Sequence, residues 1–282
     1  MRLDTHVHSL SNYSNQEELL RNMKYAGFDG GLIFSHSPKS LELPGIKSEM
    51  PSNEERMDAV LKYTDNQKYL FPFYFIDPTE PDAAEQVETA VNKGIAGFKI
   101  ICAKHFPCDA RALPVYSKIA SLNKPILFHS GILYDGKNAS GNYNRPCNFE
   151  GLLEINKLRF ALAHVSWPWT DECMAVYGKF DNYLHYSNDT NAGEMFIDLS
   201  PGTPPIFRKS VIEKLFFVGY NLKGNILYGI DTGVEGPYSG EYAKSVVARD
   251  KTIFDELGID DDIWDNITYK NILRFIGLPE NY

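Results

Sequence analysis

Short apolar segments with strand character alternate with helical segments along the whole chain of 282 residues. Parallel neighbouring strands need a crossover connection between them, and a helix is the usual one. Eight such units in about 250 residues fit a (β/α)8 barrel of the TIM type. We expect the strands at residues 2–8, 30–35, 69–77, 96–101, 125–130, 159–164, 195–199 and 225–231.

Capping residues, glycines and prolines predict where the helices begin and end. Ser14 with Glu17, and Ser52 with Glu55, have the spacing of a capping box. The chain should finish in a C-terminal helical extension. We expect helices at about 17–26, 52–63, 81–93, 109–122, 152–156, 170–179, 204–217, 241–257 and 260–276, with Asp109 and Thr170 as caps of the fourth and sixth.

The bulk composition fits one globular domain over residues 1–282, with 43% hydrophobic and 23% charged residues. A formal charge of -9 argues against nucleic acid or an anionic membrane surface as the main partner. No apolar run approaches the roughly 20 residues of a transmembrane helix. The four cysteines form no C-x-x-C pair, so we expect reduced thiols and a cytoplasmic protein.

Polar side chains close several of the expected strands. His6 and His8 stand two residues apart on the first strand, so both side chains should point to the same face. In a parallel barrel the carboxyl ends of all strands meet at one mouth. The residues that the pattern brings there are His6, His8, His36, Lys99, His129, His164 and Asp231, which include five of the seven histidines.

Imidazole and carboxylate ligands in this mixture suit a divalent metal, most often zinc, with manganese, iron or cobalt as alternatives. A strand that carries Asp4, His6 and His8 on one face is also a poor hydrophobic core, because each buried polar group needs a partner. The sequence therefore predicts a metal centre at the barrel mouth.

Several motifs in this order resemble the amidohydrolase superfamily, specifically the amidohydrolase-related (amidohydrolase 2) branch with its aminocarboxymuconate-semialdehyde decarboxylase-like enzymes. The similar segments span the chain: Asp4–His8, the strand ends at His129 and His164, the segment Phe160–Trp169, Tyr228–Asp231 and the tail Ile267–Leu278. One departure concerns the eighth strand, which in that branch usually ends in Gly-Ser-Asp followed closely by proline. Here the order is Gly229-Ile230-Asp231-Thr232-Gly233.

The resemblance implies a role for each of these residues. His6, His8, His129 and Asp231 would bind one divalent metal, and Asp231 would also accept the proton of the attacking water. His164 would orient that water or polarise the substrate. A divalent ion lowers the pKa of a bound water toward ~7. The resemblance thus implies a metal-dependent hydrolase that cleaves a carbonyl-type bond, an amide, a lactone or similar, of a small molecule.

Four alternatives stay open at this point. A non-oxidative decarboxylase would use the same ligands. Lys99 would be carboxylated and bridge two metals in some related binuclear enzymes. The His-x-His opening and His36 also resemble the polymerase-and-histidinol-phosphatase phosphoesterases, although Asp231 is not followed by their histidine two residues on. A non-catalytic ligand-binding barrel is the fourth, because a barrel by itself implies no activity.

The substrate is less constrained by the sequence. A loop from residues 131 to 147 should hang over the mouth, where Tyr143, Asn144 and Arg145 are candidates to hold a polar or carboxylate group of a small molecule. Lys104 and Arg208 are further candidates for the same role. The sequence leaves the oligomeric state open, including a homo-oligomer.

Overall fold

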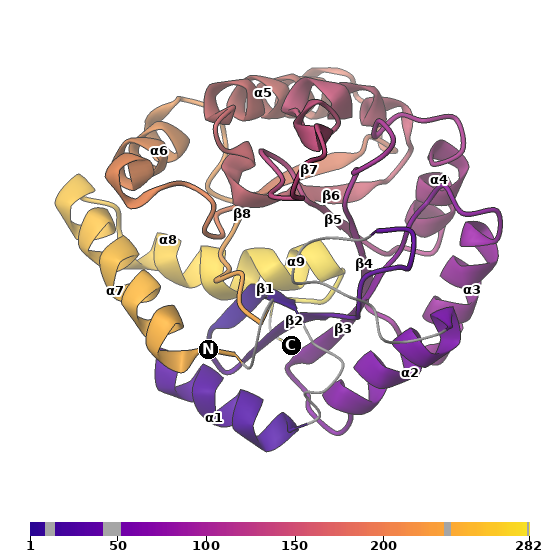
Figure 1. Ribbon diagram of the computed structural model, residues 1–282. Coiled ribbons are helices and arrows are strands. Elements are labelled where there is room, and N and C mark those ends of the chain that lie inside the picture. The colour runs from indigo at the N-terminus through magenta and orange to yellow at the C-terminus, as the bar shows by residue number, and fades with distance from the viewer. Residues whose placement is uncertain (9–14, 42–51, 234–237, 281) are drawn as a thin grey trace.

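A computed structural model describes residues 1–8, 15–41, 52–233, 238–280 and 282. It confirms the expected barrel: eight strands lie in the order β1 to β8, and each is parallel to the next. A ring of helices surrounds them (Figure 1). The strands are β1 (Leu3–His8), β2 (Gly30–Phe34), β3 (Leu70–Phe75), β4 (Gly97–Ile100), β5 (Ile126–Phe128), β6 (Arg159–Leu162), β7 (Glu194–Asp198) and β8 (Ile226–Leu227).

The barrel closes between its first and last strands. The backbone N–H of Thr5 donates to the carbonyl of Tyr228 at 3.1 Å, and that of His8 donates to Thr232 at 2.9 Å. Val7 and Thr232 form a parallel bridge beyond the end of β8. Strand β8 itself is only two residues long, so the prediction of a strand through Asp231 was too long at its end.

Helices follow most strands as expected, but some of their bounds and caps differ from those predicted: α4 begins later, at Leu113, and α5 continues to Tyr186. Asn15 caps the first helix, and Ser14 lies outside the described residues. The capping box of Ser52 and Glu55 is confirmed, whereas neither Asp109 nor Thr170 serves as a cap. The helices are α1 (Gln16–Ala26), α2 (Asn53–Thr64), α3 (Ala83–Lys93), α4 (Leu113–Ser121), α5 (Thr170–Tyr186), α6 (Pro205–Phe217), α7 (Gly240–Leu257), α8 (Asp261–Asp265) and α9 (Asn271–Ile276), with a π-helical turn, η4 (Asn266–Lys270), joining the last two.

The crossover between β5 and β6 differs from the expected short helix at 152–156. It contains two 3₁₀ segments, η1 (Ser140–Asn142) and η2 (Pro146–Glu154). No helix among the described residues is long and apolar enough to cross a bilayer.

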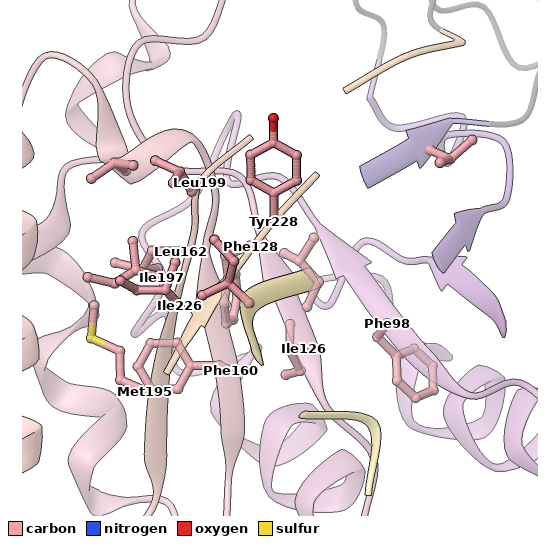
Figure 2. Close-up of a cluster of buried hydrophobic side chains, with 14 of the residues drawn as sticks. Phe98, Ile126, Phe128, Phe160, Leu162, Met195, Ile197, Leu199, Ile226 and Tyr228 are labelled. Atoms are coloured by element: carbon pink, nitrogen blue, oxygen red, sulfur yellow. The ribbon is translucent and has the colours of Figure 1, made fainter. Parts of the chain in front are cut away.

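Alternation along each strand divides the core into two layers. Ile126 and Phe128 of β5 belong to the outer layer, between the strands and the helices, and Leu127 belongs to the inner layer inside the barrel. Figure 2 shows part of the outer layer, with Phe98, Phe128 and Phe160 among the labelled side chains. Because of this alternation, every second residue of a strand points into the barrel, and Lys99 and His129 are among these residues.

The last helices cover the end of the barrel opposite the mouth. Ile272, Leu273 and Phe275 of α9 pack into the inner layer. The side-chain amide of Asn271 donates to the carbonyls of Lys223 and Ile226, at the start of β8. Figure 1 shows α8 and α9 lying across the barrel. The expected C-terminal extension therefore seals the amino-terminal end, which leaves the carboxyl end for a site.

Candidate metal centre

Three of the predicted ligands meet at the mouth of the barrel. The Nε2 atoms of His6 and His8 lie 3.4 and 3.5 Å from Oδ1 of Asp231. One ligand atom from each of the three lies within 4.8 Å of the others, which defines what we call the ligand trio. The alternation along β1 explains why both histidines reach the same point, since they stand two residues apart.

Three more predicted residues surround the trio. The His164 ring lies 5.0 Å from the rings of both His6 and His129, and Nζ of Lys99 lies 3.4 Å from Nε2 of His6. His129 is not a member of the trio, but its Nε2 is buried and has no hydrogen-bond partner. An unsatisfied buried nitrogen beside the trio suits a ligand, so His129 stays the predicted fourth one.

The environment keeps these imidazoles neutral. Burial lowers the pKa of His6, His8 and His129 well below the usual value, and it lowers that of His164 to about 4. Burial raises the pKa of Asp231 to about 6, against the lowering effect of the Lys99 ammonium. A neutral imidazole keeps a free lone pair, so the group as it stands fits a divalent cation.

A buried aspartate of β7, Asp198, orients two of the histidines, and sequence reasoning missed it. Its Oδ2 lies 2.8 Å from Nδ1 of His6, which leaves Nε2 of His6 facing the trio. Ser200 donates its hydroxyl to Asp198 at 2.9 Å, and Oγ of Ser200 lies 3.0 Å from Nδ1 of His164. The sequence could have indicated Asp198, because this residue ends an apolar strand as the other site residues do.

Asp4 fixes the seam between β8 and β1 beneath the trio. One oxygen of its buried carboxylate accepts from the backbone N–H groups of His6 and Ile230, and the other accepts from the hydroxyl of Tyr238 at 3.1 Å. Burial raises the pKa of Asp4 to about 7. Asp4 therefore holds the chain on both sides of the site, immediately before Asp231 and at His6.

The backbone of the site adopts left-handed conformations in two places, at Asp231 and from His164 onward. Asp231 has a φ of 55°, and His164 begins three consecutive residues with φ between 48° and 61°. Such clusters of strained non-glycine residues concentrate at functional sites. Gly233 has a φ of 92°, and a Cβ there would lie 2.1 Å from the carbonyl oxygen of His8. Glycine at that position therefore lets the segment after Asp231 pass against β1.

The residues predicted to bind the substrate lie in different environments. Arg208 is completely buried and forms an ion pair with Asp250 at 2.7 Å, so the hypothesis that Arg208 holds a substrate is wrong. Asn144 is also buried, and its amide nitrogen donates to the carbonyl of Cys102. Arg145 is half-exposed and pairs with Glu172 at 2.8 Å. The substrate roles of Arg145 and Tyr143 stay predictions.

Lys104 and His36 complete the predicted set. Lys104 is exposed and donates to the carbonyl of Ser40 at 2.8 Å. His36 is buried beyond the end of β2, where its carbonyl accepts from Arg56. Among the described residues, His36 is not part of the ligand trio, and the three-metal alternative stays a prediction.

We expect Asp198→Asn to weaken divalent metal binding by about 10- to 100-fold, the usual effect of losing a carboxylate that orients a metal-binding histidine. The amide cannot accept from His6 and from Ser200 in the same way. A competition titration with a chromophoric chelator measures the change. Asp58→Asn, on the exposed side of α2, is the control and should bind as the wild type does; equal affinities for both variants would contradict the role of Asp198.

No protein-family model matches the chain, and no curated protein matches it. Solved barrel structures match it over almost its full length. They include a probable 2-pyrone-4,6-dicarboxylic acid hydrolase from Acinetobacter baumannii with citric acid bound, at 12% identity and a TM-score of 0.59, covering 98% of this chain and 99% of that one. An amidohydrolase 2 from Bifidobacterium longum subsp. infantis matches at 11% identity and a TM-score of 0.56, covering 99% of both chains.

A third match is 5-carboxyvanillate decarboxylase from Novosphingobium aromaticivorans, in complex with manganese and 4-hydroxy-3-methoxy-5-nitrobenzoic acid. It has 11% identity and a TM-score of 0.59, and the match covers 99% of this chain and 96% of that one. At such identities the similarity establishes the barrel fold, and activity has to be argued from the site.

Proposed function

We propose that this chain is a metal-dependent hydrolase of the amidohydrolase superfamily, in the amidohydrolase 2 branch, acting on a carbonyl-type bond of a small molecule. The observation that carries the proposal is the convergence of His6, His8 and Asp231 at the barrel mouth, with ligand atoms within 4.8 Å of one another. When bound there, a divalent ion would polarise the substrate and lower the pKa of a water molecule. Zinc is the ion that we propose, with manganese as the first alternative.

The protein's own groups would handle the proton and orient the reactants. As the carboxylate of the ligand trio, Asp231 would take the proton of the attacking water and return it to the leaving group. Nδ1 of His164 lies 2.7 Å from the carbonyl oxygen of Pro201, and a carbonyl only accepts. Neutral His164 therefore carries its proton on Nδ1, and its Nε2 is an acceptor that can orient water.

The position of Lys99 favours a substrate that carries a carboxylate. Its ammonium group lies inside the barrel beside His6 and over the ring of Phe34, at 5.2 Å. Burial lowers the pKa of Lys99 to about 8, while Asp231 and Asp198 raise it. A cation at this depth would pair with an anionic group of the substrate. Carboxylation of the same lysine stays the alternative, and it would give two metals per chain.

A non-oxidative decarboxylase at the same site is the second candidate, favoured by the fold match to 5-carboxyvanillate decarboxylase. The test is to load the purified protein with zinc or manganese and assay lactones, amides and aromatic acids that carry carboxylates, with detection of both hydrolysis and released carbon dioxide. We expect metal-dependent hydrolysis that a chelator abolishes. Carbon dioxide release without hydrolysis would establish the decarboxylase, and a protein that binds no divalent ion would contradict both.

We also propose a cytoplasmic location. The support is that all four cysteines are free thiols in the structure, and burial raises the pKa of Cys102 and Cys173, which makes both less reactive. Fractionation of cells that produce the chain would test it.

A further inference from the structure

Residues 200–202, directly after β7, contact one edge of the His164 ring. Nδ1 of His164 lies 2.7 Å from the carbonyl oxygen of Pro201 and 3.0 Å from Oγ of Ser200. Ser200 and His164 are both buried. Two protein oxygens therefore meet the same ring nitrogen in a buried place, where an unsatisfied hydrogen-bonding group is costly.

The hydrogen bonds of Ser200 have only one possible direction. Its hydroxyl donates to Oδ2 of Asp198 at 2.9 Å, since a carboxylate is purely an acceptor. A hydroxyl has a single proton, so Oγ of Ser200 accepts from His164. The carbonyl of Pro201 accepts from the same nitrogen. Both oxygens therefore require the proton of the neutral His164 ring to be on Nδ1.

Ser200 also connects His164 to a member of the ligand trio. Oδ2 of Asp198, which accepts from Ser200, lies 2.8 Å from Nδ1 of His6. The backbone N–H of Ser200 donates to the other oxygen of Asp198 at 2.9 Å. One carboxylate is thus held by Ser200 at both oxygens and in turn orients His6. A change at Ser200 should affect both histidines.

Gly202 leaves the space that the side chain of His164 occupies. A Cβ added at Gly202 would lie 2.6 Å from Cβ of His164 and 3.0 Å from its Cγ. The Cβ of His164 cannot rotate away, because its place is fixed by the backbone, which has a left-handed φ of 61° there. Any side chain at position 202 would therefore move the ring away from Pro201 and Ser200.

We propose that residues 200–202 are a positioning segment for His164. Its two oxygens hold the proton of the ring on Nδ1, its glycine admits the ring, and Ser200 couples the ring to the carboxylate that orients His6. A catalytic role of His164 rests on the proposed function, whereas the position of the ring proton and the affinity for metal can be measured without a substrate.

The first experiment is proton–nitrogen correlation NMR of the full-length protein, isotope-labelled at histidine, with and without bound zinc. His164→Gln identifies the signals of His164. In the wild type we expect a ring protonated on Nδ1. In Gly202→Ala the two ring-nitrogen signals should move toward each other, because the proton is then shared between two tautomers. Gly224→Ala is the matched control, since the nearest atom to its Cβ would be Nη2 of Arg274 at 3.7 Å.

The second experiment is a double-mutant cycle on metal affinity, measured by chelator competition. Ser200→Ala should weaken divalent metal binding by about 3- to 10-fold, because Asp198 loses one of its hydrogen bonds. In an Asp198→Asn background the same substitution should have no further effect, since Ser200 acts through that carboxylate. Ser200→Thr keeps the hydroxyl and should restore most of the affinity.

Three results would overturn the proposal. They are a wild-type His164 ring protonated on Nε2, a Gly202→Ala protein whose His164 signals match those of the wild type, and a loss from Ser200→Ala that is as large in Asp198→Asn as in the wild type. Thermal unfolding shows whether each variant is folded, and the Ser200 cycle decides if Gly202→Ala is not. A chain that binds no metal would contradict the proposed function, while the NMR of the metal-free protein would still test the positioning segment.

Discussion

Asp231→Asn should remove the divalent metal and lower kcat/KM by about 10³-fold, within the range typical of losing a positioned acid–base group. Asp231 contributes the only carboxylate of the ligand trio, at 3.4 and 3.5 Å from the two histidines. Asparagine has nearly the same shape but no charge, so it is a weaker ligand and cannot accept the proton. Elemental analysis after dialysis measures the metal, and steady-state kinetics on a substrate from the proposed panel measures the rate.

Asp77→Asn provides the matched control, because Asp77 also follows a strand at the barrel mouth yet accepts from Thr79 and is not part of the trio. It should keep its metal. Asp231→Asn itself should fold, since it removes a carboxylate whose pKa burial raises to about 6. An Asp231→Asn protein that retained one equivalent of metal at wild-type affinity would refute the assignment of Asp231 as a ligand.

The ends of the strands could be predicted from the alternation of short apolar segments with helical segments along the chain. Apolar runs of four to six residues between helical segments predict parallel strands, and the barrel then brings the ends of these strands to one rim. His6, His8 and Asp231 were found this way, although 223 residues separate His8 from Asp231 in the numbering of the chain. The ligand trio is therefore a consequence of topology, and no detail of side-chain packing was needed.

The contacts that orient these residues could not be predicted in the same way. The bond between His6 and Asp198 joins residues 192 apart, and it depends on how far the barrel curves between β1 and β7. The interaction of Arg145 with Glu172 likewise depends on the path of the loop after β5, where 3₁₀ turns replaced the expected helix. Periodicity in the sequence indicates which face of a strand a side chain lies on and where the strand ends. Which side chains contact each other depends on the packed structure.

Asp250→Ala should cost about 3–5 kcal/mol of the free energy of unfolding, the usual penalty for breaking a buried ion pair by removing one partner. Arg208 and Asp250 have no exposed side-chain surface, and their closest atoms lie 2.7 Å apart. Arg208 also donates to the carbonyl of Leu199 at 2.8 Å, and Tyr228 donates to Asp250 at 3.1 Å. The substitution would leave the Arg208 guanidinium charged and buried without its counterion. Urea denaturation at 25 °C measures the change.

The double variant Arg208→Met with Asp250→Leu separates the charge from the packing. Because it removes both charges and replaces them with apolar side chains of similar volume, it should be more stable than Asp250→Ala, and the difference measures the penalty of the unpaired charge. Lys209→Met is the exposed control on α6 and should change stability by no more than about 1 kcal/mol. If Asp250→Ala lost as little as that control, Arg208 would have to find another partner or reach water. The ion pair of Arg208 and Asp250 would then not be the contact that holds α6 and α7 to the segment after β7. In that segment, Ser200 contacts His164 and Asp198.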